Sequence, residues 1–157
     1  MRFHLLLISC LFLAANVNAR AAELTPKITY FYDGDTVKIK DNLSEYKLRL
    51  TDIDAPERNQ SYGKTARRAL IQLCENADVQ VYITGIDKYQ RKLGKLMCNS
   101  QDASIYMIKN GHAWFNKRYS MDYTLDVAEQ ESRVQELGLW KSRNPIPPWQ
   151  WRQKHRY

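Results

Sequence analysis

Short runs of alternating apolar and polar residues constrain the fold of this 157-residue chain more than any other feature. Successive side chains of a strand point to opposite faces of a sheet, so such runs predict strands with one buried face. Three runs precede a helical stretch and two follow it: residues 28–32, 37–39, 48–50, 79–83 and 91–98. The pair Asp33-Gly34 between the first two runs is typical of a tight hairpin turn. The chain therefore favours a domain built on a small sheet.

Three other stretches predict helices that could cover this sheet. Apolar residues recur at helical spacing from Ala66 to Ala77 and form one stripe. Asp102 and Gly111 are the residue types that begin and end a short helix. A third helix is expected from about residue 122 to residue 137, before Gly138.

The order of these elements is compatible with a five-stranded Greek-key barrel of the OB type, although other α+β arrangements fit the same periodicity. The length allows one domain with a substantial core, and no repeat or linker divides the chain. The prolines of residues 144–157 argue against a helix through them, so Trp149 and Trp151 are expected to pack back on the domain.

Residues 1–19 have the layout of a secretory signal peptide. Arg2 precedes an apolar run, Leu5–Ala15, which is too short to span a bilayer, and a small-residue pattern ends at Ala19. A buried N-terminal helix is the alternative. We expect cleavage after Ala19 and a secreted or periplasmic domain, residues 20–157, without a membrane anchor.

The chain carries 24 basic and 17 acidic side chains, a net charge of +7, which favours an anionic partner such as nucleic acid. Removal of the signal peptide would leave two cysteines, Cys74 and Cys98. In an oxidising compartment they could form a disulfide, and two buried free thiols are the alternative. No spacing of Cys and His indicates a zinc site.

Charged residues cluster where the expected strands end. Asp33 and Asp35 lie at the hairpin, and residues 49–58 and 87–92 form two further clusters. The carboxylates of Asp35 and Asp54 are suitable oxygen ligands for a hard divalent cation. Each cluster alone could be an ordinary charged turn, but their combination on a basic chain favours a functional site.

The chain resembles the staphylococcal nuclease (thermonuclease) family over nearly the whole mature sequence. The matching segments occur in the family's order: YDGDTVKI, RLTDIDAPE, YGKTARRAL, DKYQRKLG, NGHAWFNKRY and LGLWKSRNPIPPW. The resemblance implies an OB-fold barrel of five strands with three helices. It also implies a Ca²⁺-dependent nuclease that cleaves DNA and RNA and leaves 3′-phosphate ends, and we expect a monomer.

The resemblance assigns roles to the acidic residues one by one. Asp35 and Asp54 match metal-binding carboxylates, and Ala55 would add its backbone carbonyl. Glu57 matches the general base, which is a poor match to water until the metal lowers the pKa of that water. Asp33 is expected to form the turn and to support the ligands.

The resemblance also assigns the residues that would bind substrate. Arg49 and Arg91 match two arginines that bind the scissile phosphate, for which a planar and permanently charged guanidinium is well suited. Lys88 and Tyr89 align with residues near a terminal phosphate, and Tyr119 aligns with an aromatic residue near the nucleotide.

One departure and one rival function qualify this assignment. Gln90 replaces a glycine that is common in the family, and it would strain the loop if the position requires a positive φ. A non-catalytic OB-fold nucleic-acid binder is the rival, and a disulfide-stapled structural domain is a third interpretation. Neither requires the retained set of acids and arginines.

Overall fold

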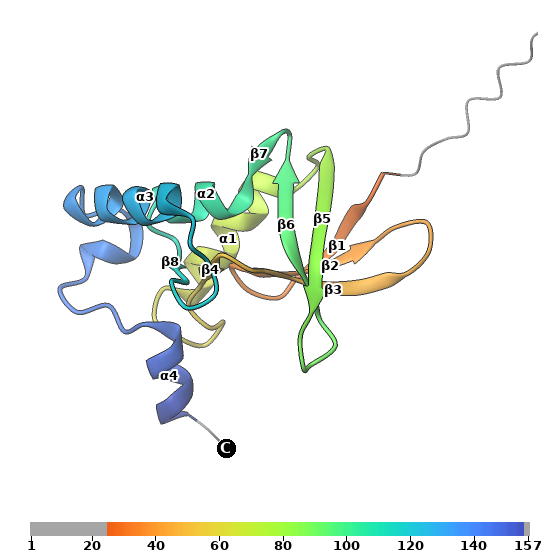
Figure 1. Ribbon diagram of the computed structural model, residues 1–157. Helices are drawn as coiled ribbons and strands as arrows, with labels where there is room; N and C mark the ends of the chain where they lie inside the picture. The colour runs from red at the N-terminus through yellow and green to blue at the C-terminus, as the bar shows by residue number, and fades with distance from the viewer. Residues whose placement is uncertain (1–24, 156–157) are drawn as a thin grey trace, which may run out of the picture.

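The computed structural model of the protein describes residues 25–155, and the expected signal peptide, residues 1–19, lies outside this part (Figure 1). The main sheet contains β1 (Lys27–Phe31), β2 (Thr36–Lys40), β3 (Glu45–Leu50), β5 (Val79–Ile86), β6 (Lys92–Cys98) and β7 (Gln101–Asp102). A second sheet pairs β4 (Ile53–Asp54) with β8 (Trp114–Phe115).

The strand order of the main sheet is β1-β2-β3-β6-β5, and β7 pairs with β6. Strands β1, β2 and β3 form an antiparallel meander, whereas β3 and β6 are parallel. In this parallel pair Arg49 lies opposite Leu93. The register therefore places Arg49 one strand away from the loop that joins β5 to β6.

Residues 25–155 also contain four α-helices and one 3₁₀-helix: α1 (Gly63–Cys74), α2 (Ala103–Lys109), α3 (Tyr123–Val134), η1 (Gly138–Lys141) and α4 (Pro148–Lys154). The three helices expected from the sequence are confirmed, and the Asp102 carboxylate caps α2 by accepting hydrogen bonds from the backbone N–H groups of Ser104 and Ile105. Helix α2 packs against both α3 and β6, so the helices gather on one side of the twisted sheet (Figure 1). Within residues 25–155 no helix is both long and apolar enough to cross a membrane.

The expected fold is confirmed as α+β, but its details need correction. The sheet has six strands rather than five, and in the described residues no pairing joins β1 to β5, so the barrel is not closed. A fourth α-helix, α4, is present where a non-helical tail was expected. It begins at Pro148, the last proline, and a proline at the first helical position costs no hydrogen bond.

The core lies between the sheet and the helices. Alternate residues of β2 and β3 point into it, as the periodicity predicts. Burial of each large apolar side chain stabilises the fold by roughly 1.5–3 kcal/mol. The fully buried residues include Val37, Ile39, Leu48, Leu50, Ile53, Leu70, Leu96, Met107, Ile108 and Leu125. This core holds the ends of β2, β3 and β4 in fixed positions.

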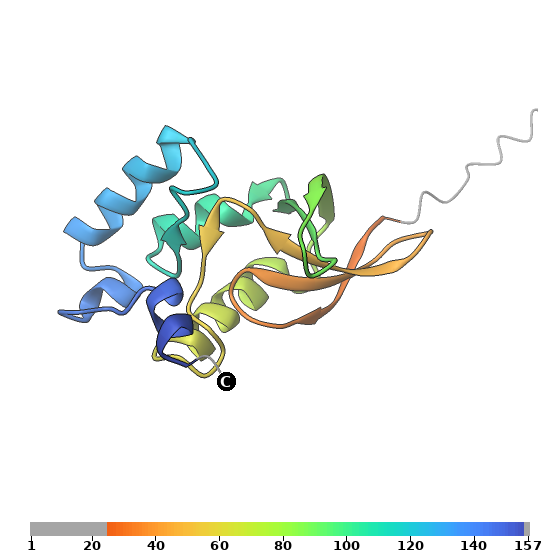
Figure 2. The ribbon, with the colours of Figure 1, turned by 60° about the horizontal axis from the view of Figure 1, so that its bottom comes forward.

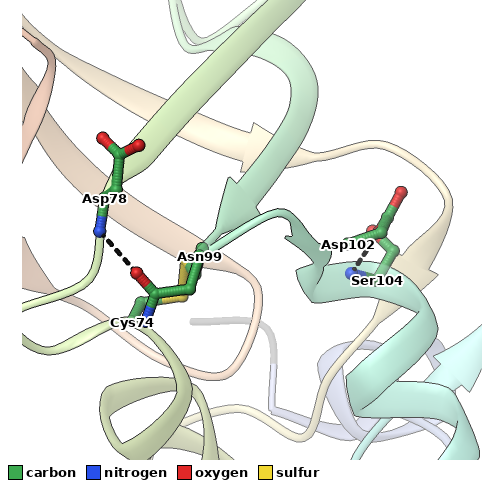
Figure 3. The surroundings of a disulfide bond; sticks show 6 residues. Cys74, Asp78, Asn99, Asp102 and Ser104 are labelled. Carbon is green, nitrogen blue, oxygen red and sulfur yellow. Dashed lines mark hydrogen bonds between the residues drawn. A yellow bond between two sulfur atoms is a disulfide. The ribbon is translucent and has the colours of Figure 1, made fainter.

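A disulfide joins Cys74 at the end of α1 to Cys98 at the end of β6, with the two Cα atoms 5.1 Å apart. The flanking residues Asp78 and Asn99 are also linked. The Asp78 N–H donates to the Asn99 side-chain oxygen at 2.8 Å (Figure 3), and the Asn99 N–H donates to the Asp78 carbonyl at 2.8 Å. The disulfide connects α1 to β6 at the end of the strands opposite the β5–β6 loop. The two hydrogen bonds join the residue before β5 to the residue after β6 at the same end.

Candidate active site

Asp35 lies at the beginning of β2 and is buried. Its Oδ2 accepts a hydrogen bond of 2.6 Å from the backbone N–H of Ala55, and its Oδ1 accepts one of 2.9 Å from the hydroxyl of Thr36. The Asp33 side chain accepts a hydrogen bond of 2.9 Å from the backbone N–H of Asp35. Asp33 therefore orders the turn, and the turn presents Asp35 toward the segment after β4.

Arg49, near the end of β3, bridges two buried carboxylates. Its Nε lies 3.1 Å from Asp35 Oδ1, and its Nη2 lies 3.0 Å from Asp54 Oδ1. Nη1 also donates to the carbonyls of Leu50 and Ile53, the latter at 2.8 Å. The Arg49 side chain is only 12% exposed, so its guanidinium is held from several directions in one orientation.

Asp54 ends β4 and is buried, whereas Glu57 lies on the segment that leads into α1. The backbone N–H of Glu57 donates to the side-chain oxygen of Gln60 at 3.1 Å, and the Glu57 side chain is 33% exposed. Pro56 between them is fully buried and fixes the direction of the turn. Glu57 is thus the acid of this group that is most accessible to solvent.

Arg152, on α4, is a site residue that the sequence analysis missed. Its Nη2 lies 2.7 Å from Asp54 Oδ2, and its Nη1 lies 3.1 Å from Asp54 Oδ1 and 2.8 Å from Glu57 Oε1. The expectation that the aromatic residues of the tail pack back on the domain was the one signal that pointed toward this contact. The ring centres of Trp149 and Trp114 lie 6.4 Å apart, which confirms that packing for Trp149, whereas the Trp151 ring stacks on His155 of the tail itself, with ring centres 3.7 Å apart.

The environment changes the acidity of both buried carboxylates. Burial raises the pKa of Asp35 to about 7, and the charge of Arg49 opposes this shift. Burial also raises the pKa of Asp54, and the hydrogen bond from Arg152 opposes it. A divalent cation beside these groups would favour their charged forms and lower both pKa values.

The donor set at this position fits a hard divalent cation. Asp35, Asp54 and the carbonyl of Ala55 are oxygen donors, as Ca²⁺ requires. In the described part of the chain no group of three or more His, Cys, Asp or Glu side chains could hold a metal ion, so backbone oxygen and water would complete the shell. All four carboxylate oxygens of the two aspartates accept hydrogen bonds or ion pairs from protein groups in this structure.

Arg91 belongs to a separate group in the loop between β5 and β6. Its Nη2 and its Nε both lie 2.8 Å from Asp87 Oδ2, and its backbone N–H donates to Asp87 Oδ1 at 3.0 Å. Gln90 has a φ of 62°, which is the left-handed conformation considered in the sequence analysis. Among the described residues no hydrogen bond or ion pair connects Arg91 to Asp35 or Asp54.

Lys88 and Tyr89, expected near a terminal phosphate, and Tyr119, expected near the nucleotide, all lie at the surface. Tyr89 is 68% exposed and Tyr119 is 71% exposed. Lys88 Nζ lies 5.0 Å from the centre of the Tyr89 ring, and the guanidinium carbon of Arg118 lies 5.6 Å from the Tyr119 ring. The structure places these residues on loops outside the carboxylate group, and their roles in binding stay predictions.

The chain belongs to the staphylococcal nuclease family. A family model described as "Staphylococcal nuclease homologue" matches residues 47–142, which is more than half of the chain. The chain is 33% identical over 134 residues to an "Uncharacterized endonuclease" of Escherichia coli O157:H7, with 85% of this chain and 88% of that protein covered. It is 34% identical over 142 residues to a "Micrococcal nuclease" of Shigella flexneri, with 83% and 82% covered.

A plant relative shares the same region within a longer chain. The "Probable staphylococcal-like nuclease CAN2" of Oryza sativa subsp. japonica is 39% identical over 112 residues, which cover 71% of this chain and 30% of the plant protein. The family expectation drawn from the sequence motifs is thereby confirmed.

Proposed function

We propose that the protein is a nuclease that hydrolyses phosphodiester bonds of DNA and RNA with Ca²⁺ as cofactor and leaves 3′-phosphate ends. Family membership and the printed names of the relatives support the nuclease class. The single observation that carries the proposal is the bridge formed by Arg49 between Asp35 and Asp54, beside Glu57. The layout of residues 1–19 supports a secreted or periplasmic enzyme, and a monomer is proposed.

Asp35, Asp54 and the carbonyl of Ala55 would hold the Ca²⁺ ion. When bound, Ca²⁺ would offset the negative charge of the phosphate and lower the pKa of a water molecule. Glu57 would accept a proton from the attacking water, and its partial exposure suits a residue that must reach solvent.

The two arginines would stabilise the phosphate in different ways. Arg49 is buried and held by backbone carbonyls, so its guanidinium is oriented before substrate arrives and little reorganisation is needed. Arg91 lies on a loop ordered by Asp87, and one N–H edge of its guanidinium is engaged there. A phosphate would therefore bind at the other edge of the Arg91 guanidinium, which includes Nη1, while Asp87 holds the first edge.

Digestion of supercoiled plasmid and of RNA by the purified protein tests the proposal. Cleavage should require Ca²⁺, stop with chelator, and leave 3′-phosphate ends in end-group analysis. Arg49→Gln should lower the cleavage rate by about 100-fold to 1,000-fold, as expected for loss of one oriented donor. Unchanged cleavage in chelator would refute the cofactor, and a mobility shift without cleavage would favour the non-catalytic binder.

The proposed location needs its own test. Expression of the whole chain in a Gram-negative bacterium, followed by fractionation and N-terminal sequencing, should give an exported protein that begins at Arg20. Retention of Met1 on a cytoplasmic protein would contradict it.

A further inference from the structure

Helix α4 is held beside the segment between β4 and α1 by apolar and polar contacts. Pro148 is fully buried, and Trp149 packs edge-on against Trp114. The side-chain N–H of Gln60 donates to the carbonyl of Ile146 at 2.6 Å. Figure 2 shows α4, in dark blue, beside the yellow segment that leads into α1. The tail therefore brings its own side chains to the active site.

The side chains of Arg152 and Arg49 differ in their exposure to water. The Arg152 side chain is 47% exposed, whereas that of Arg49 is 12% exposed. An ion pair that is partly in water is weaker and costs less to break than a buried one. Of the two guanidinium groups on Asp54, that of Arg152 is the one that can leave.

Both oxygens of Asp54 are engaged by Arg152, at 3.1 Å and 2.7 Å, and Oδ1 is also engaged by Arg49. The same Arg152 guanidinium holds Glu57 at 2.8 Å. A carboxylate offers about four lone-pair sites, and these contacts leave only one of them, on Oδ2 beside the Arg152 guanidinium. A cation that binds Asp54 through both oxygens must therefore displace at least one contact, and a cation at the remaining site would lie next to the positive charge of Arg152. Arg152 also fixes the direction in which Asp54 and Glu57 point before any cation arrives.

We propose, on the basis of the proposed function, that Arg152 is a positioning residue of the active site that competes with Ca²⁺ for Asp54. It orients Asp54 and Glu57 in the cation-free enzyme and sets the affinity for the cation. The C-terminal helix is thereby part of the active site, and Arg152 is its third arginine. A purely structural role, in which Arg152 only anchors the tail, would leave the affinity for Ca²⁺ unchanged.

Direct Ca²⁺ binding, measured by titration calorimetry without substrate, tests the proposal. The proteins to compare are the wild type, Arg152→Gln, Arg152→Lys and the control Lys154→Gln, all as full chains. Lys154 is exposed on the same helix, so its replacement removes the same charge without removing a contact to Asp54. Arg152→Lys keeps the charge, but an ammonium cannot hold both oxygens of Asp54 and Glu57 in one fork.

Arg152→Gln should bind Ca²⁺ about fivefold to tenfold more tightly, which is the gain expected when a partly exposed competing ion pair is lost. Arg152→Lys should also gain affinity, by a smaller factor, and Lys154→Gln should stay within about twofold of the wild type. Circular dichroism shows whether each variant is folded. If Arg152→Gln does not fold, the comparison of Arg152→Lys with the wild type tests the proposal.

Several outcomes would overturn the inference. Equal or weaker Ca²⁺ binding in both Arg152 variants would refute it while leaving the proposed function intact, provided that the wild type binds Ca²⁺ and cleaves plasmid. A gain in Arg152→Gln that Lys154→Gln reproduces in full, with none in Arg152→Lys, would assign the effect to net charge and also refute direct competition. Absence of Ca²⁺ binding in all four proteins would refute the inference together with the Ca²⁺-dependent function.

Discussion

The carboxylate of Asp35 accepts a hydrogen bond of 2.6 Å from the backbone N–H of Ala55, although 20 positions separate the two residues. This contact joins the turn before β2 to the segment after β4. Because the same carboxylate also pairs with Arg49 on β3, one side chain fixes the relative positions of three strand ends. The geometry of the site therefore depends on a residue that we propose as a metal ligand and that is also a structural link.

Replacement of Asp35 by asparagine should abolish most activity while preserving the fold. The amide oxygen of the new side chain can still accept the hydrogen bond from Ala55, but the amide has no charge for a cation or for Arg49. We expect cleavage in Ca²⁺ to fall by at least about 100-fold, which is a magnitude typical for loss of one electrostatic group at an active site. Initial rates of plasmid nicking, measured with circular dichroism of the same samples, test this prediction.

Asp41→Asn is the matched control, because Asp41 orders the β2–β3 turn by accepting hydrogen bonds from the backbone N–H groups of Leu43 and Ser44. It is a turn aspartate far from the carboxylate group, and its variant should cleave at the wild-type rate. Full activity in Asp35→Asn would remove Asp35 from the set of ligands.

Gln90→Gly should stabilise the protein. The left-handed backbone, with a φ of 62°, costs a residue with a side chain about 1–2 kcal/mol. Glycine removes this cost. It also increases the conformational entropy of the unfolded chain, which lowers the free energy of unfolding by about 0.4–1 kcal/mol. The free energy of unfolding is therefore expected to rise by about 0.5–1 kcal/mol. Urea unfolding measures it.

Lys88→Gly in the same loop is the control, because Lys88 has no positive φ. It should lose about 0.4–1 kcal/mol through the unfolded chain, and about 0.5–1 kcal/mol more through loss of the contact between its ammonium group and the Tyr89 ring. If Gln90→Gly loses as much as this control, the left-handed conformation stores no strain.

The sequence predicted the carboxylate group well for a physical reason. The local pairing of β2 with β3 brings Asp35 and Arg49 together, and Asp54 follows β3 by only four residues, so Arg49 can reach it. The family motifs then gave these residues their roles. Arg152 could not be found this way, because 98 positions separate it from Asp54 and the contact depends on the path of the tail.

The five longer strands of the main sheet were predictable from alternation, but the two-residue strands and the closure of the sheet were not. The strands β4, β7 and β8 have two residues each, which is too short for any periodicity to appear. Closure of a barrel depends on pairing between distant edges, and the pattern within β1 or β5 does not specify a partner. The helix α4 was not predicted because the prolines at 145, 147 and 148 argue against a helix through them, whereas the helix begins at the last of the three and continues into residues without that restriction.

The Cys74–Cys98 disulfide should stabilise the protein without contributing to catalysis. The bond closes a segment with a sequence separation of 24, and chain entropy then predicts a loss of about 3 kcal/mol in the variant Cys74→Ala/Cys98→Ala. Cleavage below the unfolding temperature should be retained. Mass spectrometry of a non-reduced digest should show one cross-linked peptide, and thiols that react with an alkylating reagent would contradict it.

His112 should make the stability of the protein depend on pH. Burial lowers the pKa of His112 below its ordinary value of 6.5, and its Nδ1 lies 2.9 Å from the hydroxyl of Tyr62. The unfolded chain therefore binds more protons than the folded protein as the pH falls through 6.5, so the free energy of unfolding should decrease with acidification. The stabilisation that comes from a neutral His112 in the folded protein is fully present above pH 6.5, and it is lost as the pH falls through the lowered pKa of the folded state.

The variant His112→Asn isolates this effect, because asparagine can accept a hydrogen bond but does not titrate. Urea unfolding of both proteins on either side of pH 6.5 should show that the wild type loses more stability on acidification than the variant. Asp35, whose pKa burial raises to about 7, titrates in the same range with the opposite sign. Asp35 is present in both proteins, so its effect cancels in the comparison. If the free energy of unfolding depends on pH in the same way in both proteins, folding does not hold His112 in its neutral form.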